Sequence, residues 1–132
     1  MHQLTVRTSR REEMMDITHQ IQELILRDSV SEGTCTIYIP HTTAGITINE
    51  NADPSVQHDI LLGLARAFPD IHEFNHSEGN AAAHIKASIM GSSQTVLIKN
   101  GRLALGTWQG IYLCEFDGPR SREIFIEFVK RR

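Results

Sequence analysis

The sequence predicts a single α+β domain, spanning residues 1–132, in which mixed or antiparallel sheets form a β-sandwich covered in part by about three helices. Three stretches with helical apolar spacing and about seven short alternating segments favour this class. Their order lacks the regular strand–helix alternation of a doubly wound parallel sheet. The last 40 residues or so contain only strand and turn patterns, which predicts an uninterrupted antiparallel meander.

Apolar residues that recur every three or four positions indicate the first two helices. Residues 17–28 carry the first stripe, for which Asp16 or Thr18 is the expected N-cap. Asp53 and Pro54 are residue types preferred at the N-cap and the first turn of a second helix, so capping explains Asp53 better than catalysis does. We expect the apolar stripe of this second helix to be buried; it consists of Val56, Ile60, Leu61 and Leu64.

A third helix is predicted between Asn80, a favourable N-cap, and Gly91, a residue type that often ends helices. The helical wheel places His84 at the edge of the apolar face and His76 and Glu78 just before the helix. The expected buried face consists of Ala82, Ile85 and Ile89. Because backbone N–H groups and the helix dipole favour anions at a helix N-terminus, this region could hold a metal, a phosphate or both.

Alternating apolar and polar residues predict the strands, which we expect at residues 2–8, 34–39, 46–49, 94–99, 102–105, 112–116 and 123–129. The Asn100–Gly101 pair is a strong hairpin signal between two of these segments. Gly106 and Gly110 flank Trp108, which predicts a bulge or a close approach of the backbone to another group. Trp108 itself is more often a core or interface anchor than a ligand contact.

The composition excludes several classes of protein. Hydrophobic residues make up 40% of the chain and charged residues 22%, and the net charge of −3 comes with no extended basic patch, so we expect no nucleic-acid partner. No apolar run approaches the roughly 20 residues of a membrane span, and no apolar leader is present, so we expect a cytoplasmic protein without a membrane partner. Cys35 and Cys114 are expected to be buried, reduced thiols.

Three histidines, His41, His76 and His84, are candidate ligands of one kind. Three imidazoles around an open position form a known catalytic zinc arrangement, so a divalent metal, Zn or Mg, is one expectation. Each histidine also has an ordinary structural explanation, as a strand-end, loop or helix-edge residue. A phosphorylated small molecule is the other expectation, with Thr42, Thr43, Lys86 and Arg120 as candidate contacts.

Lys86 raises a geometric difficulty, because it projects about 200° away from His84 on the helical wheel. A site that uses both residues would require a neighbouring subunit or a bend in the helix. The sequence contains no P-loop, GxGxxG or CxxC pattern and no spacing typical of a nucleophilic triad.

Four motifs, HTTAGITINENADPSV, HSEGNAAAHIKASIMG, LGTWQ and EFDGPRSR, cover much of the chain in order. Together they resemble the YjbQ family, UPF0047, whose members have been described as secondary thiamine-phosphate synthases. The resemblance implies a single α+β domain that assembles as a homotrimer with sites between subunits. It also implies a transferase that joins an aminopyrimidine methyl diphosphate to a thiazole phosphate.

The resemblance extends to individual polar residues. Carried over to this chain, the catalytic candidates are His41, His76, His84, Glu78 and Glu115, and the three histidines are also the metal candidates. The ligand-binding candidates are Thr42, Asn49, Asn51, Asp53, Lys86, Trp108, Gln109 and Arg120, and Asn80 is a further motif position. Two other functions fit the same residues: a hydrolase that uses histidine-held zinc, and a non-catalytic binding protein for phosphorylated metabolites.

Overall fold

The computed structural model describes residues 1–132 and contains three helices and eight strands. The helices are α1 (Thr18–Arg27), α2 (Pro54–Ala67) and α3 (Ala81–Met90). The strands are β1 (His2–Arg7), β2 (Glu13–Asp16), β3 (Gly33–Tyr38), β4 (Ala44–Glu50), β5 (Ser93–Lys99), β6 (Arg102–Leu103), β7 (Gln109–Glu115) and β8 (Ser121–Lys130). No helix combines the length and the apolar character that crossing a membrane requires.

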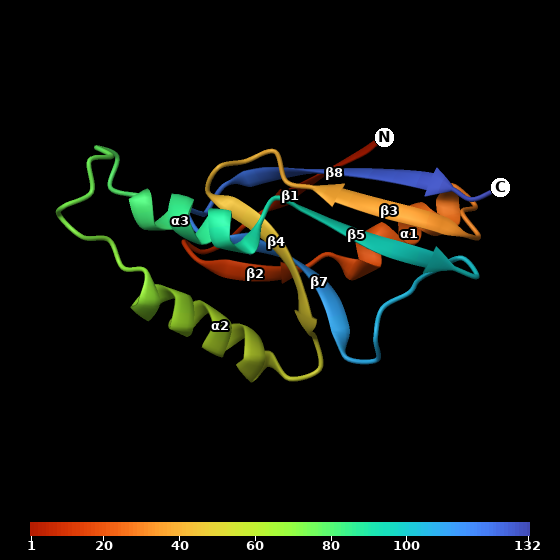
Figure 1. The fold of residues 1–132 in the computed structure, drawn as a ribbon, viewed down its shortest axis with the longest axis horizontal. Coiled ribbons are helices and arrows are strands. Elements are labelled where there is room, and N and C mark those ends of the chain that lie inside the picture. The colour runs from red at the N-terminus through yellow and green to blue at the C-terminus, as the bar shows by residue number, and fades with distance from the viewer.

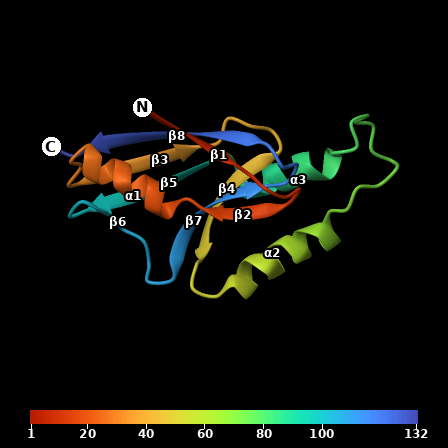
Figure 2. The same ribbon diagram turned by 180° about the vertical axis from the view of Figure 1, so that it is seen from behind.

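The strands form two antiparallel sheets that lie close together (Figure 1). The larger sheet has the order β1-β8-β3-β5-β6, and the smaller has the order β2-β7-β4. Helix α1 lies against the larger sheet, whereas α2 extends away from the strands, as both views show (Figures 1 and 2). The predicted α+β class and the three helices are confirmed.

The predicted meander at the end of the chain is wrong. Strand β6 pairs with β5, but β7 crosses to the smaller sheet, where it lies between β2 and β4. Strand β8 returns to the larger sheet and pairs with β1 and β3. Strand β2 was not predicted, because its four residues, EMMD, show no alternation of apolar and polar side chains.

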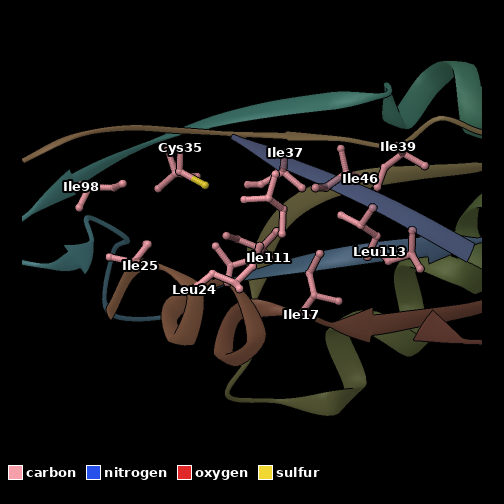
Figure 3. Packing of buried hydrophobic residues seen from close by; sticks show 14 of the residues in the cluster. Ile17, Leu24, Ile25, Cys35, Ile37, Ile39, Ile46, Ile98, Ile111 and Leu113 are labelled. Atoms are coloured by element: carbon pink, nitrogen blue, oxygen red, sulfur yellow. The ribbon is translucent and has the colours of Figure 1, made fainter. Parts of the chain in front are cut away.

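One hydrophobic core joins both sheets to α1 (Figure 3). The predicted stripe on α1 supplies Ile21, Leu24 and Ile25, and Ile17 just before the helix is equally buried. Asp16 accepts hydrogen bonds from the backbone N–H of Thr18 (2.9 Å) and from its hydroxyl (2.6 Å), which satisfies a donor at the helix start. The larger sheet contributes Ile37, Ile98 and Ile126 among others, and the smaller contributes Ile46, Ile111 and Leu113.

The turn residues behave as expected. Asn100 and Gly101 have φ angles of 53° and 75°, and they connect the paired residues Lys99 and Arg102. The backbone of Gly110 comes so close to Asn51 that an added Cβ would lie 2.9 Å from the Asn51 side chain. The close approach predicted from the glycines around Trp108 is therefore confirmed at Gly110.

The buried faces of α2 and α3 differ from those predicted from the sequence. No residue of α2 is buried, and Leu62 of this helix is 41% exposed, because α2 touches the rest of the chain mainly near β2. The buried face of α3 consists of Ala82, Ala83, Lys86 and Ala87, whereas Ile89 is 53% exposed. Small side chains face the sheet because α3 lies very close to β4, and the larger side chain of Ile89 is excluded from this contact.

Helix α3 and strand β4 come into close contact at Gly45. An added Cβ at Gly45 would lie 2.8 Å from the carbonyl oxygen of Gly91 and 2.9 Å from Cβ of Met90. Gly45→Ala should therefore lower the free energy of unfolding by about 1–3 kcal/mol, as overpacked substitutions do. The measurement is urea denaturation at a fixed chain concentration.

Gly63→Ala is the matched control, because Gly63 lies in the middle of α2 and an added Cβ would meet nothing within 4 Å. Alanine at this helical position should raise the stability by about 0.5–1 kcal/mol. Equal effects of the two substitutions would contradict the close α3–β4 contact.

Candidate functional site

A cavity of about 460 Å³ lies between the β3–β4 loop and one side of α3. His41 and Thr42 line it from the loop, and His84 and Ser88 line it from the helix. Ser92, just after α3, completes the polar lining. Strand β3 and helix α3 are held at this edge by the hydrogen bond from the backbone N–H of Ile39 to the Ser92 carbonyl (2.7 Å).

The position of this cavity differs from the anion site expected at the helix N-terminus. His84 lies in the first half of α3, but the cavity continues along the helix to Gly91 at its C-terminal end. The helix dipole at that end is negative, so it does not favour an anion there. An anion in this cavity therefore gains nothing from the helix dipole and depends on other donors, such as side-chain N–H and O–H groups.

The imidazole of His41 is held by the backbone of β8. Its Nε2 accepts a hydrogen bond from the backbone N–H of Glu123 at 2.8 Å. Burial lowers the pKa of His41 below the usual value, and the positive charge of Arg122 lowers it further. Both the hydrogen bond and the lowered pKa favour the neutral imidazole.

A buried ion pair supports the loop that carries His41. Glu115 and Arg122 are 0% and 2% exposed, and Arg122 donates to both carboxylate oxygens of Glu115, through Nε at 2.9 Å and through Nη2. Arg122 Nη2 also donates to the hydroxyl of Thr43 at 2.8 Å, and Thr8 donates to Glu115 at 2.8 Å. Burial by itself would raise the pKa of Glu115, but the hydrogen bonds from Arg122, the Asp117 N–H and Thr8 outweigh burial and lower it.

This arrangement corrects the role expected for Glu115. Each of the two carboxylate oxygens of Glu115 already accepts two hydrogen bonds, and the side chain has no contact with solvent. A general base must reach the proton that it removes, and Glu115 does not reach the cavity. Its observed role is to position Arg122, which in turn holds Thr43 next to His41.

His76 and His84 form an edge-to-face pair, with ring centroids 5.0 Å apart and planes at 78°. Glu78 lies in the same exposed loop as His76, and no hydrogen bond links it to either histidine. His84 thus packs against the ring of His76 and lines the same cavity as His41. The structure does not place all three rings around one point.

The expected three-histidine metal site is not formed within one chain. No group of three or more His, Cys, Asp or Glu side chains is arranged to hold a metal ion. His41 also uses the Nε2 lone pair, which a metal would need, to accept the Glu123 N–H. The residues of a single chain therefore do not fit a three-imidazole zinc centre.

Lys86 and Arg120 lie away from the cavity. Lys86 is 6% exposed on the opposite side of α3, where its Nζ lies 2.7 Å from Glu12 Oε2. Arg120 Nη2 lies 3.0 Å from Asp117 Oδ2, and the same carboxylate oxygen accepts from Asn80 Nδ2 at 2.9 Å. The expected phosphate contacts of Lys86 and Arg120 are therefore not made in this cavity.

The remaining candidates gather at the other end of β4. Asn51 donates its backbone N–H to the Trp108 carbonyl at 2.8 Å, and Gln109 accepts the Gly106 N–H at 2.8 Å. Asn49 accepts the N–H of the next residue. Asp53 accepts the Ser55 N–H at 2.9 Å, so its predicted role as the cap of α2 is confirmed, and the same hydrogen bond lowers its pKa.

The two groups of candidates are far apart in one chain. The seven residues of strand β4 separate Thr43 from Asn51, and eight residue steps in an extended strand span about 26 Å. Trp108, which is 63% exposed, belongs to the distant group. A ligand the size of a thiazole phosphate cannot contact His41 and Trp108 of the same chain.

Sequence reasoning missed several residues that shape the cavity. Ser88 and Ser92 line it, and Arg122 supports it from below through Thr43. The signal for Ser88 was available, because it follows His84 by one helical turn and therefore shares its face. Arg122 carried no such signal, since its partner Glu115 lies on another strand in another sheet.

The fold and this cavity define a class of protein: a small α+β domain with antiparallel sheets. Its cavity is lined by imidazole and hydroxyl side chains and lies between a loop that joins two strands and a short helix. Residues 2–131 match the family described as UPF0047 protein YjbQ-like, and the chain belongs to this family. It is 54% identical to UPF0047 protein MJ1081 of Methanocaldococcus jannaschii over 124 residues, which cover 94% of this chain and 90% of the relative. It is 52% identical to UPF0047 protein YugU of Bacillus subtilis over 127 residues, which cover 96% of both chains.

Solved structures agree with this assignment. A crystal structure of a YjbQ/UPF0047-family protein from Clostridium acetobutylicum is similar with a TM-score of 0.95 and 50% identity, covering 98% of this chain and 100% of that chain. Protein APE1520 of Aeropyrum pernix has a TM-score of 0.93 and 33% identity, covering 98% of each chain. The predicted family and the YjbQ-like fold are confirmed.

Proposed function

We propose that the cavity between the β3–β4 loop and α3 binds the phosphate of a small phosphorylated molecule. The observation that carries this proposal is that His41 and His84 line the same cavity together with Thr42 and Ser92, whose hydroxyls have no other acceptor within the chain; Ser88 also lines it, but its hydroxyl donates to the His84 carbonyl at 2.9 Å. Imidazole N–H and hydroxyl groups donate hydrogen bonds to phosphate oxygens, and such bonds to a charged acceptor are stronger than neutral ones.

The second part of the proposal is that the site is completed between the subunits of a homotrimer, as the resemblance implies. Trp108 and Asn51 of a neighbouring chain would then face His41 and His84. Within one chain these two groups lie near opposite ends of β4, where Thr43 and Asn51 are about 26 Å apart. Exposed apolar side chains on α2 and α3, Leu62 and Ile89, support an association of chains. The expected mass is three times 14.9 kDa.

The reaction that we propose is the transfer implied by the family resemblance. The lone pair of a thiazole nitrogen forms a C–N bond to the pyrimidine methylene while the C–O bond breaks, and its electrons leave with the diphosphate. Positioning of the two reactants and stabilisation of the negative charge on the leaving diphosphate are the main requirements. The cavity donors would hold phosphate, and Trp108 would stack on a heterocycle.

The test is an assay of the purified chain with both thiamine precursors, on a sample prepared without added metal and of measured metal content. We expect release of pyrophosphate only when both precursors are present. Trp108→Ala should lose this turnover but keep its affinity for inorganic phosphate. Failure of the wild-type chain to bind phosphate or pyrophosphate would contradict the proposal; phosphate binding without turnover would support a non-catalytic binding protein instead.

A metal-dependent hydrolase is the alternative that the His76–His84 pair favours. Two imidazoles could hold zinc if a neighbouring chain supplied a third ligand. This alternative requires metal in the purified sample at about one ion per chain or per shared site. His76→Ala should remove that metal in the hydrolase but should leave phosphate affinity unchanged under our proposal.

We also place the protein in the cytoplasm. Cys35 and Cys114 are buried free thiols, and burial raises the pKa of each to about 12, so both stay protonated and unreactive. Two such thiols support a reducing compartment.

A further inference from the structure

The hydrogen bond between His41 and β8 determines which ring nitrogen carries the proton. The partner at 2.8 Å is the backbone N–H of Glu123, and a backbone amide nitrogen can only donate. Nε2 of His41 must therefore supply a lone pair. In the neutral ring the single proton is then on Nδ1.

The other nitrogen of the ring is available to a ligand. His41 Nδ1 has no hydrogen-bond partner within the chain. It is also not a buried atom, because the one buried side-chain N or O atom that lacks a partner is Asn80 Oδ1. Nδ1 is therefore open to solvent, and His41 lines the cavity. Because the Glu123 N–H occupies Nε2, the polar ring group that His41 can still offer to an occupant of the cavity is the Nδ1–H donor.

We propose that His41 is a specificity-determining residue whose fixed Nδ1–H donor selects ligands that carry an oxyanion acceptor, such as phosphate. This inference rests on the proposed phosphate-binding function of the cavity and identifies the atom that makes the contact. The fixed tautomer disfavours a metal cation, which needs a lone pair from the ring. It also prevents Nε2 from acting as a general base while the bond to Glu123 is intact.

The buried ion pair beneath the loop keeps this tautomer in place. Arg122 holds Thr43 through its hydroxyl, and Arg122 and Glu123 are neighbours at the start of β8. Burial and the charge of Arg122 oppose a second proton on His41, which would remove the Nε2 acceptor; they outweigh the charges of Glu115 and Glu123, and the pKa of His41 is lowered. The groups that face His41 are thus Arg122, Glu115 and Glu123 from the sheets, and His84 from α3.

The first experiment is NMR of the full chain with ¹⁵N-labelled histidine at neutral pH. We expect His41 Nε2 to show the chemical shift of an unprotonated ring nitrogen and Nδ1 that of a protonated one. A protonated Nε2 would overturn the assignment, even if phosphate binding were intact. The expected tautomer in a wild-type chain that does not bind phosphate would support the assignment and contradict the proposed function.

The second experiment compares His41→Asn with His41→Gln, using inorganic phosphate as the probe. The Asn amide nitrogen replaces Nδ1, whereas the Gln carbonyl can replace Nε2 as the acceptor for the Glu123 N–H. We expect H41N to keep phosphate affinity within about threefold of wild type and H41Q to lose about tenfold. Retained affinity in H41Q with loss in H41N would overturn the proposal.

Discussion

Replacing Arg122 by Ala should lower the free energy of unfolding by about 3–5 kcal/mol, the range for breaking a buried ion pair by removal of one partner. Glu115 would remain fully buried, with two hydrogen bonds lost from its carboxylate and no positive charge beside it. Thr43 would also lose the donor that fixes its hydroxyl. We therefore expect the largest stability loss of any single polar substitution in this chain.

The measurement is urea denaturation of R122A and wild type at the same chain concentration, because association of chains would make stability concentration-dependent. Arg120→Ala is the matched control, two residues away in sequence and paired with Asp117 at the surface. We expect it to cost less than about 1 kcal/mol, as exposed ion pairs do. A loss below about 1 kcal/mol in R122A would contradict a supporting role for the buried pair.

His84→Ala should weaken the binding of inorganic phosphate by about ten- to a hundredfold. Hydrogen bonds to charged groups contribute roughly 1.5–3 kcal/mol, and about 1.4 kcal/mol corresponds to tenfold in affinity. His84 is half-buried on a helix whose small side chains hold it close to β4. Isothermal titration calorimetry with phosphate gives the affinity directly.

The control for His84→Ala is His72→Ala, because the His72 side chain is 94% exposed and lies outside the cavity. H72A should bind phosphate like wild type. The mass of the assembly, measured by light scattering, should be the same for both variants. Unchanged phosphate affinity in H84A would remove His84 from the site.

Local patterns in the sequence predicted the helices well, but not the sheet order. The stripe from Ile17 to Ile25 and the cap at Asp53 depend on neighbours within a few residues, so the sequence reports them directly. The predicted antiparallel meander was wrong because β7 and β8 pair with strands from the first half of the chain. Such pairings depend on tertiary packing, which strand propensity does not contain.

The site was predicted in part, for similar reasons. Residue chemistry and the family resemblance identified His41, Thr42 and His84, which do line one cavity. Helical periodicity predicted that Ile89 would lie on the buried face of α3 and that Lys86 would not. The structure shows the opposite, because the close contact with β4 requires small side chains on that face. The atom that His41 offers was not predictable, since it depends on a backbone N–H 82 residues away in sequence.

The most direct test of the central claim is a titration of the full chain with inorganic pyrophosphate, followed by the ¹⁵N signals of all seven histidines. We expect saturable changes at His41 and His84. The exposed imidazoles of His19, His58 and His72 should not change, and they serve as internal controls. Changes confined to those exposed histidines, or no saturable change at His41 and His84, would contradict a phosphate site in this cavity.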